Sequence, residues 1–180
     1  MKQIKNLTHG VDRLFIENER FNTTLISVNF YLPLTKRGIA EYSLLSGVMA
    51  SSCAAFPRFS DLNLRQKELY SASVGAISDK INDTQLIKFF ATYLNNDVVL
   101  EDLETEAHKL LLEIIFNPLL ENGTFKESEV AREKRLILEK IKSLINEKRG
   151  YSIEKATSEM FKGSAYATNK LGDKDDLEKI

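Results

Sequence analysis

A run of small and apolar residues between Thr35 and Phe56 constrains the fold more strongly than any other feature of the sequence. Its large apolar residues recur at spacings of three and four, which is the period of one helix face. They are Ile39, Tyr42, Leu45, Val48, Met49, Cys53 and Phe56. Pro57 ends the pattern, because proline lacks the N–H that a continuing helix needs. The run predicts a buried helix, around which the rest of the chain builds a core.

The segments on both sides of this helix show strand and helix patterns in turn. Strands are predicted where β-branched and aromatic residues are frequent, at Val11–Glu17, Thr23–Leu32, Ala72–Ile81 and Gln85–Tyr93. Further helices are predicted at Leu62–Tyr70, Leu103–Phe116, Phe125–Met160 and Asp173–Ile180. Asp61 is expected to cap the first of these helices, and hairpin turns are expected at Asn18–Asn22 and Asn82-Asp83. This order predicts a single α+β domain over residues 1–180, with a largely antiparallel sheet packed against helices.

The last two helical segments carry two further expectations. The inner stripe of the Phe125–Met160 helix is predicted to consist of its regularly spaced apolar residues, namely Val130, Leu136, Ile137, Ile141, Leu144 and Ile145. The chain ends inside the helical pattern that begins at Asp173. We therefore expect a C-terminally truncated fragment of a longer, two-domain protein.

Charge and composition argue against several classes of partner. Twenty-five Lys and Arg residues against 26 Asp and Glu residues leave a formal net charge of -1. Without a basic surplus, nucleic-acid binding is not expected. Met1–Gly10 lacks the apolar stretch of a signal peptide, and no run approaches the roughly 18 apolar residues of a membrane span, so we expect a cytoplasmic protein with no membrane partner. Cys53 is the single cysteine, which excludes an intrachain disulfide and a thiolate zinc knuckle.

Two segments together resemble a known protein family. Gly38–Leu45 reads GIAEYSLL and follows a predicted strand, and Glu129–Ile141 reads EVAREKRLILEKI. Supporting segments are Ser73–Ile77, Asp83–Gln85, Gly163–Tyr166 and Leu171-Gly172. This order resembles the N-terminal domain of the pitrilysin/insulinase-type zinc peptidases, the inverzincins, in which Gly-x-Ala precedes an H-x-x-E-H helix and a later helix carries an E-R-x-V-I-L-x-E-like segment.

The resemblance covers essentially the whole chain and implies the α+β metallopeptidase domain that is called LuxS/MPP-like. The stretch Ile145–Ser152, INEKRGYS, looks closest to one branch of the family. That branch contains the peptidase-like proteins associated with aminopentanol modification of elongation factor P in Gram-positive bacteria.

The family's metal site is degenerate when its motif is laid on this sequence. In active relatives two histidines at i and i+4 bind zinc, the glutamate between them activates the zinc-bound water, and a distant glutamate completes the coordination. The two histidine positions become Glu41 and Leu45, the general-base position becomes Leu44, and the third ligand becomes Lys140, or Glu139 if the register differs by one. Leucine cannot ligate zinc or accept a proton, and an ammonium group repels the metal. The resemblance thus implies no catalytic residue, no bound metal and no cofactor, with zinc expected only in active relatives.

The substitutions also suggest what replaces the metal. Glu41 and Lys140 carry opposite charges, so one hypothesis is an ion pair between them that bridges the two helices. The alternative is that both side chains reach solvent separately.

Other chemically capable residues favour structural interpretations. His9 is expected in a turn or at the surface, and His108, among Glu104, Glu106 and Glu113, on a solvated helix face. Cys53 is expected to be a small core residue rather than a nucleophile, because no histidine is placed to activate it. Three serines of the buried helix, which could be imagined as nucleophiles, are expected to allow close packing against the sheet; they are Ser46, Ser51 and Ser52.

The residues and the resemblance together predict a non-catalytic, peptidase-like subunit. It would pair with a catalytic relative, or with itself, to enclose a peptide or protein substrate. An extended peptide could add to an open strand edge, at Thr23–Leu32 or Ala72–Ile81. Two alternatives remain: an active zinc metalloendopeptidase with a displaced site built from His9, His108 and acidic residues, or a purely structural assembly subunit.

Overall fold

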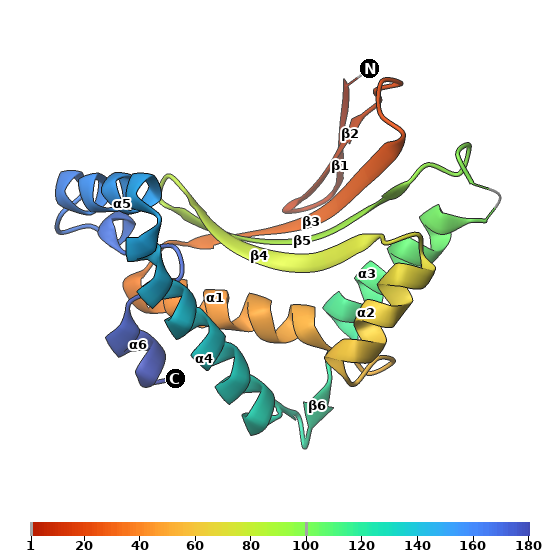
Figure 1. The fold of residues 1–180 in the computed structure, drawn as a ribbon. Coiled ribbons are helices and arrows are strands. Elements are labelled where there is room, and N and C mark those ends of the chain that lie inside the picture. The colour runs from red at the N-terminus through yellow and green to blue at the C-terminus, as the bar shows by residue number, and fades with distance from the viewer. Residues whose placement is uncertain (1, 100) are drawn as a thin grey trace.

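The structure is a computed structural model that describes residues 2–99 and 101–180. Its strands are β1 (Lys2–Thr8), β2 (Val11–Ile16), β3 (Thr23–Pro33), β4 (Ser73–Ile81), β5 (Thr84–Leu94), β6 (Leu120–Glu121) and β7 (Thr124–Phe125). Its helices are α1 (Lys36–Ser51), α2 (Phe59–Glu68), α3 (Leu103–Phe116), α4 (Glu127–Ser143), α5 (Lys148–Met160) and α6 (Lys174–Glu178), with short 3-10 turns η1 (Leu144–Asn146) and η2 (Ala165–Ala167). Antiparallel strands pack against helices (Figure 1), which confirms the predicted α+β class.

The main sheet has the strand order β3-β5-β4, with β5 in the centre. Alternate β5 side chains are buried on one face, because successive side chains of a strand point to opposite sides. They are Gln85, Ile87, Phe89, Ala91 and Tyr93. Helices α1, α2 and α3 lie beneath this face (Figure 1) and enclose the main core cluster with it.

Helix α1 forms a middle layer between the sheet and a second pair of helices, α4 and α6 (Figure 1). Its apolar residues therefore divide between two clusters. One set, which includes Tyr42, Leu45 and Met49, packs on the main core. The other set joins α4 and α6 in a second cluster, whose buried members are Ala40, Leu44, Val48, Ile137 and Leu177. Burial on two sides explains why the predicted helix is rich in small residues.

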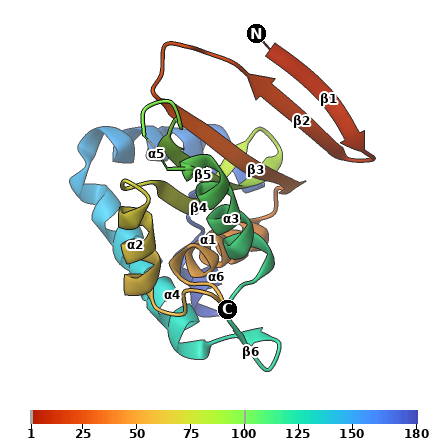
Figure 2. The same cartoon turned by 90° about the vertical axis from the view of Figure 1, so that its right-hand side faces the viewer.

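The N-terminal strands pair differently from the prediction. The sequence indicated a hairpin between Val11–Glu17 and Thr23–Leu32, with its turn at Asn18–Asn22, and this is wrong. Strand β2 pairs instead with β1, which the sequence analysis did not recognise as a strand. Their turn contains Gly10 at a φ of 75°, a conformation that glycine adopts without the usual steric cost. The β1–β2 hairpin stands away from the main sheet (Figure 2).

The helix at Thr35–Phe56 is confirmed, but it ends at Ser51 rather than at Phe56. Beyond it, Cys53 forms an isolated β-bridge with Pro118, and the Ala54 N–H donates to the Asn117 carbonyl. These long-range bonds to the end of α3 compete with continuation of the helix.

Two other helix boundaries also differ. Helix α2 begins at Phe59, so Asp61 lies in its first turn and does not cap it. Its carboxylate instead accepts two hydrogen bonds of 2.9 Å from the Arg58 guanidinium. The predicted helix at Phe125–Met160 is broken into α4, η1 and α5, because the Glu147 carboxylate accepts from the Gly150 N–H and starts a new helix there.

The predicted inner stripe of that segment is only partly correct. Ile137 is buried, whereas Leu136 and Ile145 are 43% and 61% exposed. Leu138 contacts the second cluster in place of Leu136, together with Val130 and Ile141. By contrast, the Leu103–Phe116 helix has the predicted bounds, and the strands predicted around Asn82-Asp83 form the β4–β5 hairpin.

Candidate functional site

Helix α1 carries three of the four positions at which the family resemblance places metal chemistry. The Thr35 hydroxyl caps its first turn by accepting a 3.0 Å hydrogen bond from the Gly38 N–H. From this start, the helix period directs residues 41 and 45 along one face and residue 44 along another. The sandwich of sheet, α1 and α4/α6 then determines what each side chain meets.

Leu44, at the general-base position, is a core residue. It is 4% exposed and lies in the second cluster, where α1 contacts Ile137 of α4 and Leu177 of α6. Its neighbours in this cluster are apolar. An apolar contact thus occupies the position at which the resemblance places the general base.

Leu45 and Glu41 lie outside the second cluster, in two different environments. Leu45 is half-buried and packs on the main core beneath the sheet. Glu41 pairs with Arg37 one turn earlier, at 2.6 Å between Oε1 and Nε, and its side chain is 38% exposed. Such i,i+4 pairs on a helix surface contribute only about 0.3–0.5 kcal/mol.

The proposed ion pair between Glu41 and Lys140 is wrong. Within residues 2–99 and 101–180, Glu41 forms its ion pair with Arg37 and none joins it to Lys140, which is exposed on α4. Glu139, the alternative third-ligand position, pairs with Arg135 at 3.0 Å and is also exposed. Arg37 lies on the same helix and reaches Glu41 without any tertiary constraint. The apolar cluster around Leu44, rather than a charge pair, connects α1 to α4.

A close approach of α4 to α1 that the sequence analysis missed involves Glu133. Its side chain is 14% exposed, and the Arg132 guanidinium donates to both Glu129, at 2.8 Å, and Glu133, at 3.0 Å. Gly47 allows this approach: a Cβ atom there would lie 3.0 Å from Glu133 Oε2. Gly47, Arg132 and Glu133 border a shallow hollow of about 400 Å³, which Phe59 of α2 also lines. A glycine inside an otherwise regular helix was the signal that could have indicated this contact.

The two histidines lie on different elements. His9 is exposed in the β1–β2 turn, as predicted. His108 on α3 is half-buried, and its Nε2 is hydrogen-bonded to the Tyr93 hydroxyl at 2.8 Å. Burial raises the pKa of Tyr93 to about 12. In the part of the chain that the structure describes, no group of three or more His, Cys, Asp and Glu side chains is arranged to hold a metal ion.

The three serines that were considered as nucleophiles, Ser46, Ser51 and Ser52, are buried, and Ser52 lies just beyond the end of α1. The Ser46 and Ser51 hydroxyls donate to the carbonyls of Ser43 and Val48 in the same helix, so neither hydroxyl is presented to a substrate. Among the described helices, none combines the length and the apolar character needed to cross a membrane.

Cys53 is fully buried in the main core, as predicted, and burial raises the pKa of its thiol. Because the thiolate is the reactive form, we expect Cys53 in the folded protein to resist alkylation by iodoacetamide at pH 8. In urea the thiol should react at the rate of a free cysteine. Mass spectrometry of the labelled protein measures both rates, and rapid modification under native conditions would contradict the core assignment.

Comparison with known proteins places this site in context. No protein-family model matches the chain. It is 29% identical over 183 residues to a "Probable inactive metalloprotease YmfF" of Bacillus subtilis (strain 168), an alignment that covers 100% of this chain and 43% of the other. The crystal structure of a conserved protein from Enterococcus faecalis V583 is similar with a TM-score of 0.89 and 25% identity, over 99% of this chain and 43% of that one.

A protease from Helicobacter pylori shares the fold, with a TM-score of 0.64 and 14% identity over 100% of this chain and 40% of the other. The chain therefore spans less than half the length of each of these relatives. It is a homologue of a probable inactive metalloprotease, with a protease-like fold over its whole length.

Proposed function

We propose that this protein is a non-catalytic, peptidase-like member of the pitrilysin/insulinase-type zinc peptidases. The observation that carries the proposal is the burial of Leu44, at the general-base position, in the apolar cluster that joins α1 to α4 and α6. The similarity to a protein named a probable inactive metalloprotease supports the same conclusion.

The remaining positions of the site support the loss of chemistry. Leu45 packs on the main core, and Glu41 is neutralised by Arg37. A hydrolytic zinc site needs three protein ligands and an open position for water. Leu45, whose side chain has no lone pair, occupies one ligand position. The apolar contact of Leu44 fills the space that a zinc-bound water would need.

The role that fits a peptidase-like scaffold without this chemistry is that of a subunit. We propose that the protein pairs in the cytoplasm with a zinc-bearing relative, and that the two together enclose a peptide or protein substrate. It holds no metal cofactor of its own. The proposal rests on the resemblance, on the degenerate site and on the name of the Bacillus subtilis relative.

Zinc content tests the loss of the metal site. After incubation with excess zinc and desalting, elemental mass spectrometry should find far less than one zinc per chain, because Leu44 and Leu45 supply no ligand. A zinc peptidase that retains H-x-x-E-H, treated in parallel, is the positive control. One tightly held zinc per chain would overturn the proposal and reopen the displaced-site alternative.

Reconstitution tests the role as a subunit. The protein at its full encoded length is mixed with a purified zinc-bearing relative from the same organism, and a fluorogenic peptide reports cleavage. We expect co-elution on size exclusion, no cleavage by this protein alone, and faster cleavage by the pair than by the relative alone. Co-elution without faster cleavage would favour the structural-subunit alternative, and separate elution would contradict the pairing.

A further inference from the structure

Residues 164–178, which contain η2 and α6, connect the two layers that lie on either side of α1. The segment begins beside the end of the main sheet, passes Ala40 near the start of α1, and reaches α6 on the other side of that helix (Figure 1). Gly163, just before it, has a φ of 92°, and an added Cβ atom there would meet nothing within 4 Å. The segment, here called the strap, thus starts at a flexible residue type in open surroundings.

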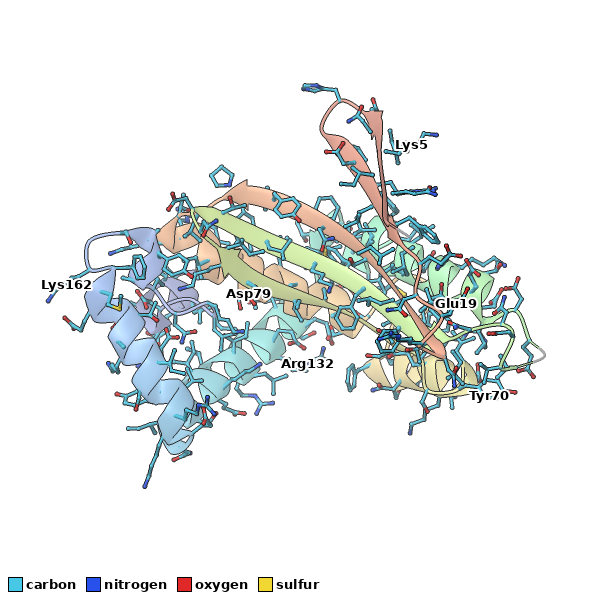
Figure 3. The ribbon with its side chains drawn as sticks, turned by 90° about the horizontal axis from the view of Figure 1, so that it is seen from above. Lys5, Glu19, Tyr70, Asp79, Arg132 and Lys162 are labelled. Carbon is cyan, nitrogen blue, oxygen red and sulfur yellow. The ribbon has the colours of Figure 1, made fainter. Side chains whose placement is uncertain are left out.

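The first attachment of the strap is Lys80 on β4. Its ammonium donates to the Tyr166 carbonyl at 2.8 Å and to the Thr168 carbonyl, and it lies 4.7 Å from the centre of the Tyr166 ring. Figure 3 shows Asp79, the neighbour of Lys80 in sequence, at the end of the sheet beside this segment. Hydrogen bonds from a charged donor are stronger than neutral ones. One side chain therefore holds the backbone of the strap at two points.

The surroundings of Lys80 make these two bonds difficult to replace. The side chain is half-buried. Burial lowers the pKa of its ammonium, whereas the carboxylates of Glu154 and Asp79 raise it. Thr168, whose carbonyl accepts one of the bonds, is only 5% exposed. Without the ammonium, this carbonyl would lose its partner in a place that water does not readily reach, which is unfavourable.

The second attachment is apolar and lies at the other end of the strap. Leu177 is fully buried in the second cluster, which also contains Leu44 and Ile137, and Leu171 packs against the same cluster. Helix α6 has five residues, and a helix of this length is not stable by itself in water. Its structure therefore depends on the contact of Leu177 with the cluster.

Between these two attachments the strap forms hydrogen bonds with itself. They are local, such as the bond from the Thr168 N–H to the Ala165 carbonyl. In the part of the chain that the structure describes, the two bonds from Lys80 are the only hydrogen bonds that connect residues 165–178 to another helix or strand. Segments with so few tertiary bonds open locally, at a lower free energy than the whole fold needs to unfold.

We propose that the strap opens and closes as one unit over the second cluster, and that the Lys80 ammonium is the latch that holds it closed. In the closed state α6 lies on α1, and Leu177 is buried with Leu44. In the open state the two carbonyls separate from Lys80, and an apolar surface of α1 and α4 that includes Leu44 and Ile137 faces solvent. The proposal depends neither on the loss of zinc chemistry nor on pairing with a relative.

Hydrogen exchange, measured by mass spectrometry on the protein at its full encoded length, tests the latch. Lys80→Met removes the charge and keeps a long side chain, so exchange in residues 164–178 should become at least about tenfold faster, because bonds to a charged donor are lost. Exchange in β5 should not change. Lys80→Arg, which keeps the charge, should restore most of the protection.

Lys170→Met is the matched control for the loss of a positive charge. Lys170 lies on the strap itself, but its ion pair with Asp79 is 3.8 Å long and more than 40% exposed on both sides. Such pairs contribute little to stability. This variant should therefore leave the exchange of the strap at the wild-type rate.

Thiol labelling tests the opening itself, also in protein that retains Lys80. Leu44→Cys places a thiol in the second cluster, and Cys53, which is fully buried in the main core, is the internal reference. If the strap opens alone, the introduced thiol should react with a maleimide faster than Cys53. Adding Lys80→Met should accelerate this reaction about tenfold and leave the rate at Cys53 unchanged.

Four results would overturn the proposal. Equal rates for the two thiols would mean that the second cluster opens only when the whole protein unfolds. Unchanged exchange of the strap in Lys80→Met, or an equal acceleration in Lys170→Met, would show that the Lys80 charge is not the latch. Loss of the entire fold in Lys80→Met would show that Lys80 supports more than the strap.

Discussion

Replacing Gly172 by alanine is expected to lower the free energy of unfolding by about 2–5 kcal/mol, combining the strain of a left-handed backbone with overpacking. Gly172 has a φ of 92°, and an added Cβ atom would lie 2.7 Å from both Cα and Cβ of Ala40. The obstacle is the backbone of α1, which cannot move aside as a flexible side chain can. The clash would push α6, and with it Leu177, out of the second cluster.

Gly163 provides a matched control for this substitution. It has the same φ of 92°, but an added Cβ atom would meet nothing within 4 Å. Gly163→Ala should therefore cost only the backbone strain, about 1–2 kcal/mol. Urea denaturation of the two variants and the wild type measures the difference. Equal losses for both variants would show that the segment around Gly172 is not packed on α1.

Replacing Leu44 by glutamate, the residue that the resemblance implies for active relatives at this position, is expected to destabilise the fold by about 3–5 kcal/mol at pH 7. The substitution removes a buried apolar side chain and places a carboxylate in the cluster with Val48, Ile137 and Leu177. Leu44→Met, which conserves volume, should cost less than about 1.5 kcal/mol.

The pH dependence of Leu44→Glu separates lost packing from buried charge. Burial raises the pKa of a carboxyl group above its usual value of about 4.3. The folded state then binds its proton more tightly than the unfolded state, so the variant should lose stability as pH rises from about 4 towards 7. Urea unfolding at both pH values, with Leu44→Met in parallel, measures this. A loss that is independent of pH would mean that the carboxylate reaches solvent.

These two predictions concern the same second cluster. Position 44 is enclosed by α4 and α6, and Gly172 brings α6 against α1 at Ala40. A carboxylate at position 44 would be enclosed by these apolar side chains unless α6 moved away. The apolar cluster thus connects α1 to α4 and α6.

Local sequence patterns were sufficient where one segment alone determined the structure. The Leu103–Phe116 helix was predicted with its observed bounds, because its apolar period is regular and Asn117-Pro118 stops it. The β4–β5 hairpin followed from two β-rich segments around Asn82, which adopts a φ of 52° in the turn. Such signals depend on neighbours along the chain rather than on distant contacts.

Predictions failed where distant segments compete for the same backbone or side chain. The bridge from Cys53 to Pro118 ends the first helix early, and the new cap at Glu147 divides the last long helix. Strand β2 pairs with β1 rather than with β3. The prediction missed this pairing because Lys2–Thr8 lacks a strong strand pattern in the sequence. Glu41 forms its ion pair with Arg37 rather than with Lys140, because a partner at i,i+4 on the same helix is close without any tertiary contact.

The sequence by itself determined that positions 44 and 45 carry leucines, which cannot ligate a metal or accept a proton whatever the fold. It also determined the α+β class, because strand and helix periods are local properties. Only the tertiary structure decided that Leu44 and Leu45 face two different cores, and that β5 is the central strand between β3 and β4. The physical reason is that burial and strand pairing depend on which distant segments meet, and the pattern of one segment does not specify its partners.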